Sequence, residues 1–289
     1  MPAAKITRLK DKITKLKEEI VRLNAINEQM IKSVDKQISL TDPDARSMAT
    51  SGKDTGIVGY NVQAAVDTTH HLIVAHEVTN IGTDRNQLSG MAEQARTELG
   101  AEKLEVVADR GYYEGKQIKA CEDAGITVTL PKPQTSGSKA EGRFGKQDFV
   151  YLPAEDVYLC PAGERLPYRF TGEEDGKKLR RYWTNACKTC AMKSQCTTGP
   201  ERRISRWEHE AVLETVQTRL DNNPGAMALR RQTAEHPFGT IKCWMGATHF
   251  LTMTLPKVAA EMALNVLAYN MKQVIAILGV GALMEAMRA

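Results

Sequence analysis

Apolar residues recur with a seven-residue period at the start of the chain. Ile6, Ile13, Ile20 and Asn27 fall seven apart, and each is followed three positions later by a further core position: Leu9, Leu16, Leu23 and Met30. This period predicts an amphipathic helix, which we assign to residues 1–40. Isoleucine at the first core position and leucine at the second favour a parallel two-stranded coiled coil, with Asn27 fixing its register. The alternative is one helix that packs on the core of its own chain.

The hydrophobic period changes to two beyond Gly59. Tyr60, Val62, Ala64 and Val66 alternate with other residues, and Asp67 follows them. A second apolar run begins at residue 72, so residues 59–75 are predicted to form a β-hairpin.

Helical and strand patterns then alternate. The predicted order is a helix at 86–99, a strand at 104–109, a helix at 118–124 and a strand at 126–130. Strands followed by alternating helix and strand indicate an α/β layer with a mixed sheet. Residues 151–206 do not continue this rhythm and carry four cysteines, which suggests a Cys-rich insertion. From residue 207 the helical period dominates, so the α/β core is expected in two parts, residues 41–150 and 207–289.

Charge is unevenly distributed along the 289 residues, although the net charge is only +4. Residues 1–38 hold nine Lys/Arg against five Asp/Glu, and residues 160–206 hold eleven against five. Two basic segments beside an acidic remainder fit a protein that contacts a polyanion.

No signal-peptide pattern opens the chain. The most apolar stretch, residues 258–284, is interrupted by Glu261, Lys272 and several amide side chains. This favours a buried or amphipathic helix over a membrane span. We therefore expect a cytoplasmic protein with no membrane partner.

Three carboxylates are candidates for chemistry. Asp67 and Asp109 each end a predicted strand and precede a turn, where open α/β sheets often place their functional crevice. Glu235 has an arginine four positions before it, Arg231, and a lysine seven after it, Lys242. Taken singly, the two aspartates could be turn caps. Arg231, Glu235 and Lys242 could likewise form the solvent-exposed face of a helix.

If the three acids converge, a hard cation such as Mg²⁺ is needed to offset their repulsion. Two such ions can support an in-line displacement at phosphorus. Arg231 and Lys242 would then bind phosphate oxygens. Pro237 predicts that Glu235 lies at a helix start, which keeps Lys242 on its face and moves Arg231 to the preceding turn.

Four separated motifs occur in a familiar order. They are Asp42-Pro-Asp-Ala-Arg46, Gly59-Tyr-Asn-Val-Gln-Ala-Ala-Val-Asp67, Ala108-Asp-Arg-Gly-Tyr112 and Glu235-His-Pro-Phe-Gly-Thr-Ile-Lys242. Together they resemble the DDE transposases of bacterial insertion sequences, from about residue 40 to near the C-terminus.

The resemblance implies a set of expectations. The fold would be RNase H-like, a mixed sheet flanked by helices. Asp67, Asp109 and Glu235 would be the catalytic acids that hold two Mg²⁺ ions. Arg231 and Lys242 match the basic members of the family's signature around the glutamate. The enzyme would hydrolyse phosphodiesters at transposon ends and transfer the strand into double-stranded target DNA, as a homodimer on DNA in the bacterial nucleoid.

Two departures from the family pattern bear on activity. The signature commonly has a tyrosine three residues before the arginine, and here that position is Ala228. Members also usually carry an N-terminal DNA-binding domain ahead of the linker helix, so a truncated copy is one interpretation of this chain. Two alternatives to a transposase therefore stay open. One is a nuclease of the same fold, and the other is a DNA-binding or dimerising remnant that regulates the full-length enzyme.

The cysteines divide into two groups. Cys121 and Cys243 are expected to be isolated packed thiols. Cys160, Cys187, Cys190 and Cys196 cluster, with one C-x2-C pair and two outlying members, a pattern typical of zinc-ribbon-like sites. We expect Zn²⁺ there, with reduced unligated thiols as the alternative. Arginine and aromatic residues interleaved with the cysteines could contact DNA or form small packed cores.

Overall fold

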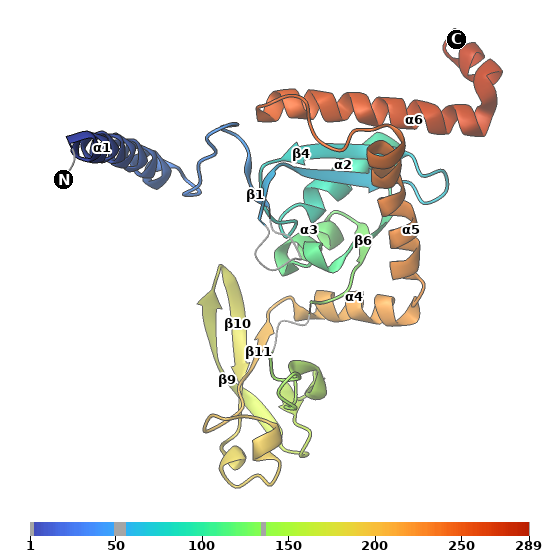
Figure 1. The fold of residues 1–289 in the computed structure, drawn as a ribbon. Helices are drawn as coiled ribbons and strands as arrows, with labels where there is room; N and C mark the ends of the chain where they lie inside the picture. The colour runs from blue at the N-terminus through green and yellow to red at the C-terminus, as the bar shows by residue number, and fades with distance from the viewer. Residues whose placement is uncertain (1–2, 49–55, 134–136, 289) are drawn as a thin grey trace. The chain divides into compact units, whose positions relative to one another are not determined.

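The chain folds into two compact units. The structure, a computed structural model, describes residues 3–48, 56–133 and 137–288 (Figure 1). Unit 1 comprises residues 1–104 and 227–289, and unit 2 comprises residues 105–226.

Unit 1 holds a β-hairpin and most of the long helices. Its elements are α1 (Ala3–Lys32), β1 (Arg46–Met48), β2 (Ile57–Gly59), β3 (Asn61–Val66), β4 (Ile73–Thr79), α2 (Leu88–Leu99), α5 (Ala226–Gly239), a π-helical turn (Thr240–Trp244) and α6 (Leu255–Ala286). The expected hairpin and the expected helix after it are therefore present. The strands β1 and β2 pair antiparallel, as do β3 and β4.

A β-bulge interrupts the pairing of β3 with β4. The register shifts between Ala65 and Val66, so that Val66 pairs with Ile73 while Ala65 pairs with Ala75. Ile73 then faces the cluster under α6, and Ala75 faces the cluster under α2. Bulges bend a strand and redirect its side chains. Here the bulge lies directly before Asp67.

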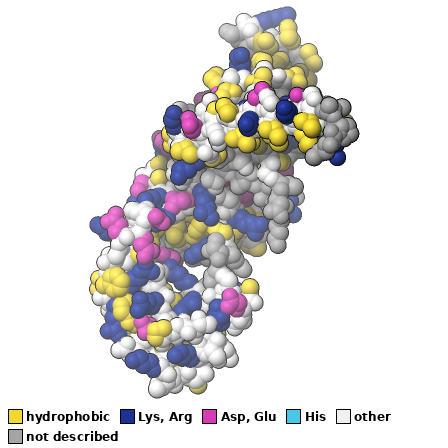
Figure 2. Space-filling view, turned by 60° about the vertical axis from the view of Figure 1, so that its left-hand side comes forward, with side chains coloured by type: hydrophobic (Ala, Val, Ile, Leu, Met, Phe, Trp, Pro, Cys, Tyr) yellow, Lys and Arg dark blue, Asp and Glu magenta, His cyan; other side chains and the backbone are white. Residues whose placement is uncertain are grey.

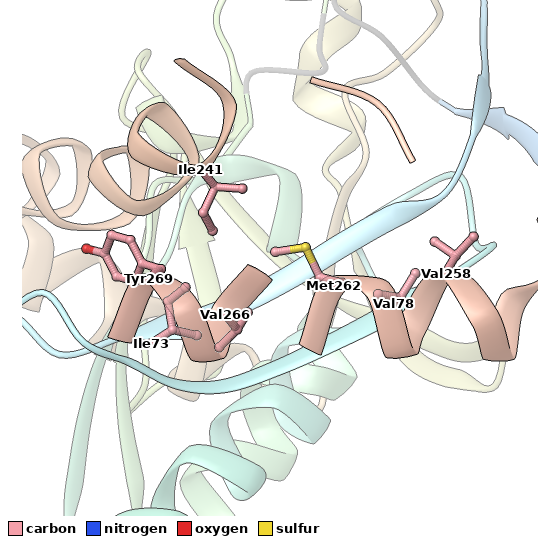
Figure 3. Packing of buried hydrophobic residues seen from close by; sticks show 7 residues of the cluster. All are labelled: Ile73, Val78, Ile241, Val258, Met262, Val266 and Tyr269. Carbon is pink, nitrogen blue, oxygen red and sulfur yellow. The ribbon is translucent and has the colours of Figure 1, made fainter. Parts of the chain in front are cut away.

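The larger core of unit 1 lies between the hairpin and α6 (Figure 3). It comprises Ile73, Val78, Ile241, Val258, Met262, Val266 and Tyr269. The four residues from α6 are spaced by three or four positions, which places them on one stripe of that helix. Burial of such a stripe stabilises α6 by about 25 cal/mol per Å² of apolar surface.

The beginning of α6 is held by the Asp42-Pro-Asp segment. The carboxylate of Asp42 accepts hydrogen bonds from the Tyr60 hydroxyl (2.7 Å) and from the backbone N–H of Thr254. Asp44 Oδ2 accepts from the backbone N–H of Leu255 (2.8 Å). Carboxylates suit this position because the first N–H groups of a helix lack partners within it. This local role explains the acids of the first motif.

The apolar stripe of α1 remains exposed. Its core positions Ile6, Leu9, Ile13, Leu16, Ile20 and Leu23 are between 44% and 64% exposed. A helix packed on its own chain would bury such a stripe. The exposed stripe is compatible with a coiled-coil seam, and both interpretations of this helix stay predictions.

Unit 2 joins a small α/β segment to an antiparallel sheet. Its elements are β5 (Leu104–Val107), a 3₁₀ turn (Arg110–Tyr112), α3 (Gly115–Asp123), β6 (Ile126–Thr129), a 3₁₀ turn (Lys146–Asp148), β7 (Val150–Leu152), β8 (Val157–Leu159), β9 (Arg165–Glu174), β10 (Lys177–Tyr182), two 3₁₀ turns (Asn185–Lys188 and Lys193–Gln195), β11 (Ile204–Trp207) and α4 (Glu210–Asn222). The strand–helix–strand order expected at 104–130 is present.

Residues 150–207 form a five-stranded sheet in the order β11-β10-β9-β8-β7. It has a small aromatic-rich core of Phe149, Tyr158, Leu166, Tyr182 and Ile204. The mixed α/β class is thus confirmed. The sheet expected to unite the hairpin with β5 and β6 is not continuous, because β3–β4 and β5–β6 are hydrogen-bonded as separate two-stranded sheets.

Among the described residues, α6 is the one helix long and apolar enough to cross a membrane by length and composition. A core helix can pass the same test, and the N-terminal half of α6 supplies four buried residues to the core of unit 1. Asn270, near the middle of α6, bonds both the backbone N–H and the carbonyl of Ile73 (2.9 and 2.8 Å). Gly279 has φ of 79°, which interrupts the helical backbone there.

Candidate functional site

Asp67 directly follows β3 and shapes the hairpin turn. Its Oδ2 accepts a hydrogen bond from the backbone N–H of His70 (2.6 Å) and lies 3.3 Å from the Nδ1 of the same residue. Burial alone would raise the pKa of Asp67, but the backbone bonds from His70 and Thr69 and the nearby His70 ring lower it. Asp67 is therefore an ionised carboxylate at neutral pH that also acts as a turn cap.

The turn after Asp67 lies beside the helix that carries Glu235. The rings of His71 and His236 are 5.1 Å apart, centroid to centroid. The hydroxyl of Tyr269, on α6, donates to the carbonyl oxygen of His71 (2.7 Å) and lies 3.1 Å from Nδ1 of His236. Since that hydroxyl uses its proton on His71, it accepts from a protonated Nδ1 of His236. Tyr269 thus joins residues 71 and 236, neighbours of two candidate acids.

Glu235 lies within α5, at an exposed position. Its side chain is 59% exposed, and Oε1 accepts from Nη1 of Arg230 (3.2 Å). The prediction that Pro237 starts a helix is wrong, because α5 continues through it. Proline lacks the N–H that would bond residue 233, and the backbone widens into a π-helical turn three residues later. The buried proline ring packs inside unit 1.

This course of the helix reverses the expectation for the two basic residues. Arg231 and Glu235 are four positions apart in one α-helix and therefore share a face. Lys242 lies in the π-helical turn. In a continuous α-helix a residue seven positions after Glu235 would lie on the same face, but the i→i+5 hydrogen bonds of the π-turn move Lys242 away from that face. Arg231 and Lys242 are both exposed, as a contact to phosphate requires.

Asp109 lies in unit 2, two residues after β5. Its Oδ1 accepts from the backbone N–H of Gly111 (2.7 Å) and caps the 3₁₀ turn that follows. The capping role that its sequence context allowed is therefore present. Asp67 and Glu235 belong to unit 1, so the structure brings together the surroundings of two of the three acids within one unit.

Within residues 3–48, 56–133 and 137–288, no group of three or more His, Cys, Asp or Glu side chains is arranged to hold a metal ion. The site residues in unit 1 are hard oxygen donors, which is the chemistry that Mg²⁺ prefers. The chemical type of these ligands, carboxylate oxygens, therefore suits Mg²⁺.

The four clustered cysteines meet at one pocket in unit 2. Cys160, Cys187, Cys190 and Cys196 all line a pocket of about 20 Å³, together with Arg202 and several apolar side chains. Burial raises the pKa of the Cys196 thiol; Arg202 lowers it, and the three other thiols raise it further. Of the remaining two cysteines, Cys121 is buried as expected, whereas Cys243 is exposed, so the prediction of a packed thiol there is wrong.

Lys and Arg side chains are numerous on the part of the molecule that holds the five-stranded sheet (Figure 2). Several of them are already engaged. Trp183 has the guanidinium groups of Arg169 and Arg203 at 5.6 and 5.0 Å from its ring centroid, and Arg180 lies 4.8 Å from the ring of Tyr168. Arg206 forms an ion pair with Glu214. These contacts favour a packing role for the aromatic residues.

Sequence reasoning missed the joining role of Tyr269 and the capping roles of Asp42 and Asp44. Tyr269 lies in an apolar helix with no motif around it, and its partners are about 198 and 33 positions away. No local pattern signals such a residue. The Asp42-Pro-Asp segment did carry a signal, since acids flanking a proline are common in turns.

Comparison with known families supplies the remaining evidence. Residues 159–275 match a family model described as transposase DDE domain. The matched segment contains Arg231, Glu235 and Lys242 as well as the four clustered cysteines, while Asp67 and Asp109 precede it. No curated protein and no solved structure matches the chain. Residues 159–275 thus resemble the transposase DDE domain, which supports the DDE transposase that the motifs predicted.

Proposed function

We propose that the chain is a DNA transposase that cuts phosphodiester bonds at transposon ends and joins the freed strand to target DNA. The family match supports a nuclease or transferase type of enzyme. The observation that carries the proposal is the contact cluster of His71, His236 and Tyr269. It brings the turn capped by Asp67 beside the helix that presents Glu235.

Asp67, Asp109 and Glu235 are the proposed ligands of two Mg²⁺ ions. DDE transposase domains generally use divalent metal ions. When bound, such ions would activate the attacking hydroxyl and stabilise the leaving oxygen. The lowered pKa of Asp67 keeps its carboxylate charged at neutral pH, and the exposure of Glu235 leaves it reachable from solvent.

The chain's own basic residues would orient the DNA backbone. Arg231 shares a helix face with Glu235. Its guanidinium group can bind a phosphate by donating two parallel N–H···O hydrogen bonds. Lys242 would supply a more flexible charge from the π-helical turn. In the first reaction water forms a bond to phosphorus and the 3′-oxygen leaves with a proton. In the second reaction that 3′-hydroxyl attacks a target phosphodiester and a second 3′-oxygen leaves.

The complete site requires Asp109 beside the other two acids. We propose an RNase H-like core in which Asp67 and Asp109 each follow a strand of the catalytic fold. Strand ends on one side of a sheet place their following residues at a common edge. A Cys-rich insertion between the second and third acids, at residues 151–206, belongs to the same proposal.

DNA cleavage and joining by purified protein test the proposed function. Supercoiled plasmid with Mg²⁺ should be nicked, and a labelled duplex with a free 3′-hydroxyl should become joined to the plasmid. Asp67→Asn, Asp109→Asn and Glu235→Gln should each lower both rates by roughly 10³-fold or more, since residues of one catalytic set act as a unit. Asparagine retains the oxygen that caps each turn, so folding is preserved. Glu98→Gln, on the exposed face of α2, is the matched control.

Each outcome decides between the alternatives. Nicking without joining would indicate a nuclease of the same fold. DNA binding without either reaction would indicate a regulatory remnant, the alternative that Ala228 favours. Full activity in Asp109→Asn would contradict the assignment of the second acid.

Cleavage of the protein backbone by bound Fe²⁺ tests whether the three acids meet. Fe²⁺ takes oxygen ligands similar to those of Mg²⁺, and with ascorbate and peroxide it cuts peptide bonds near its site. We expect cuts close to Asp67, Asp109 and Glu235, and their suppression by excess Mg²⁺. Cuts near residues 67 and 235 but not near 109 would contradict the three-acid site.

The proposed partners follow from the same chemistry. They are double-stranded DNA at the transposon ends and in the target, and a second copy of the chain through α1. A parallel coiled coil would bury the exposed stripe of α1 and place Asn27 at a core position. A protein that acts on chromosomal DNA would work in the cytoplasm.

A further inference from the structure

Four thiols from three turns converge in unit 2. Cys160 follows β8, Cys187 and Cys190 flank the end of one 3₁₀ turn, and Cys196 follows the next. All four line the same small pocket. The turn after Cys160 is tight, because the N–H of Gly163 donates to the Cys160 carbonyl (2.9 Å) and Gly163 has φ of +83°. A left-handed φ favours glycine at this position.

The segment between β10 and β11 has almost no core of its own. None of the residues 183–203 is buried, and the two short 3₁₀ turns within it contain no buried side chain. A 21-residue connection with so little apolar burial cannot offset its conformational entropy by packing alone. Small segments of this kind are usually stapled by disulfides or by a metal. The six cysteines are free thiols.

We propose that Cys160, Cys187, Cys190 and Cys196 bind one Zn²⁺ ion that staples residues 183–203 to the five-stranded sheet. Four thiolates suit zinc because it takes tetrahedral sulfur ligands at about 2.3 Å. The pocket of about 20 Å³ offers space for a single small ion. No three of the thiols are at ligand positions in the structure, so the sulfurs move inward on binding.

Charge around the pocket supports this occupant. Zinc with four thiolates carries a net charge of −2, and the thiol protons pass to solvent on binding. The cationic side chains of Arg202 and Lys193 line the pocket. Nε of Arg202 is buried with no hydrogen-bond partner in the part of the chain that the structure describes. A metal-bound thiolate sulfur in the pocket would accept a hydrogen bond from this N–H group.

Metal content of the full chain tests the proposal independently of any DNA activity. Wild-type protein and the Cys243→Ser control, which removes an exposed thiol outside the pocket, should each carry about one zinc per chain. The double variant Cys187→Ser/Cys190→Ser should carry almost none. Co²⁺ in place of zinc should give the visible absorption of a tetrahedral thiolate site in the wild type and in the control alone.

A second measurement needs no variant. Trypsin sites lie within the proposed staple at Lys188, Lys193, Arg202 and Arg203. Cleavage there should be slow in the zinc-loaded wild type, fast after chelation and slow again after zinc is restored. Zinc far below one per chain together with no Co²⁺ spectrum would overturn the proposal. So would full zinc content in the folded double variant, or trypsin cleavage that chelation leaves unchanged.

Discussion

At the scale of single residues, two of the carboxylates proposed for catalysis also cap turns. Asp67 and Asp109 each accept backbone N–H bonds in the turn after a strand. Such hydrogen bonds stabilise the turn and also fix the orientation of the carboxylate. The structural role expected for a strand-end aspartate is therefore compatible with the proposed ligand role. Tyr269, which is fully buried, links His71 and His236, residues near the two acids of unit 1 in the sequence.

Replacing Tyr269 by phenylalanine tests this link. The change removes the bonds to the His71 carbonyl and the His236 ring, and should lower the free energy of unfolding by about 1–3 kcal/mol because both partners lose a hydrogen bond. The rate of DNA cleavage should fall further than stability explains, with a lower kcat at unchanged DNA affinity. Tyr113→Phe, in unit 2, is the control. A cleavage rate equal to that of the control would show that Tyr269 has no positioning role.

At the scale of elements, an ion pair connects α4 to the turn before β7. Lys146 Nζ lies 2.6 Å from Oε1 of Glu210, and Oε2 of Glu210 accepts from the N–H of Trp207 (3.1 Å). Burial alone would raise the pKa of Glu210, but Lys146 and the Trp207 N–H lower it below its ordinary value of 4.5. The pair therefore holds the start of α4 in place only while Glu210 is charged.

This pair makes the stability of unit 2 depend on pH. A depressed carboxyl pKa contributes stability that is present above the unfolded value and lost as pH falls through the folded value. Glu210→Gln should therefore lower the unfolding free energy by about 2 kcal/mol at pH 7, with a difference that shrinks below about pH 4.5. Thermal unfolding of both proteins across this range measures it. A difference that stays constant with pH would rule out the ion pair as its source.

At the scale of the whole molecule, the apolar stripe of α1 is exposed among the residues that the structure describes. Its core positions carry isoleucine and leucine in the order that favours parallel dimers. A dimer would bring two catalytic units to one DNA molecule, and transposition requires two ends to be cut.

The oligomeric state is checked by light scattering during gel filtration. Wild-type protein should be a dimer, and Ile13→Asp should be a monomer, because a charge in the seam costs far more than the weak pairing of three to four heptads supplies. Lys15→Asp, at an exposed position away from the seam, should stay dimeric. A monomeric wild type would contradict the coiled coil, and a dimeric Ile13→Asp would place the interface elsewhere.

The sequence by itself determined many of the elements and pointed to a family resemblance. Periods of seven, two and 3.6 residues reflect which side chains are buried, so the hairpin, α1, α2 and the β5–α3–β6 order could be predicted. Motifs around Asp67, Asp109 and Glu235 indicated the transposase DDE family, whose model matches residues 159–275.

Only the tertiary structure decided how distant residues meet. The path of the chain through Pro237 could not be predicted, because the cost of a helix proline depends on whether packing of its ring compensates. Tyr269 and the capping acids act through partners far away in the sequence, which local patterns do not encode. The convergence of four cysteines on one pocket was also decided by tertiary contacts, since the spacing predicted zinc binding but left unligated thiols as an alternative.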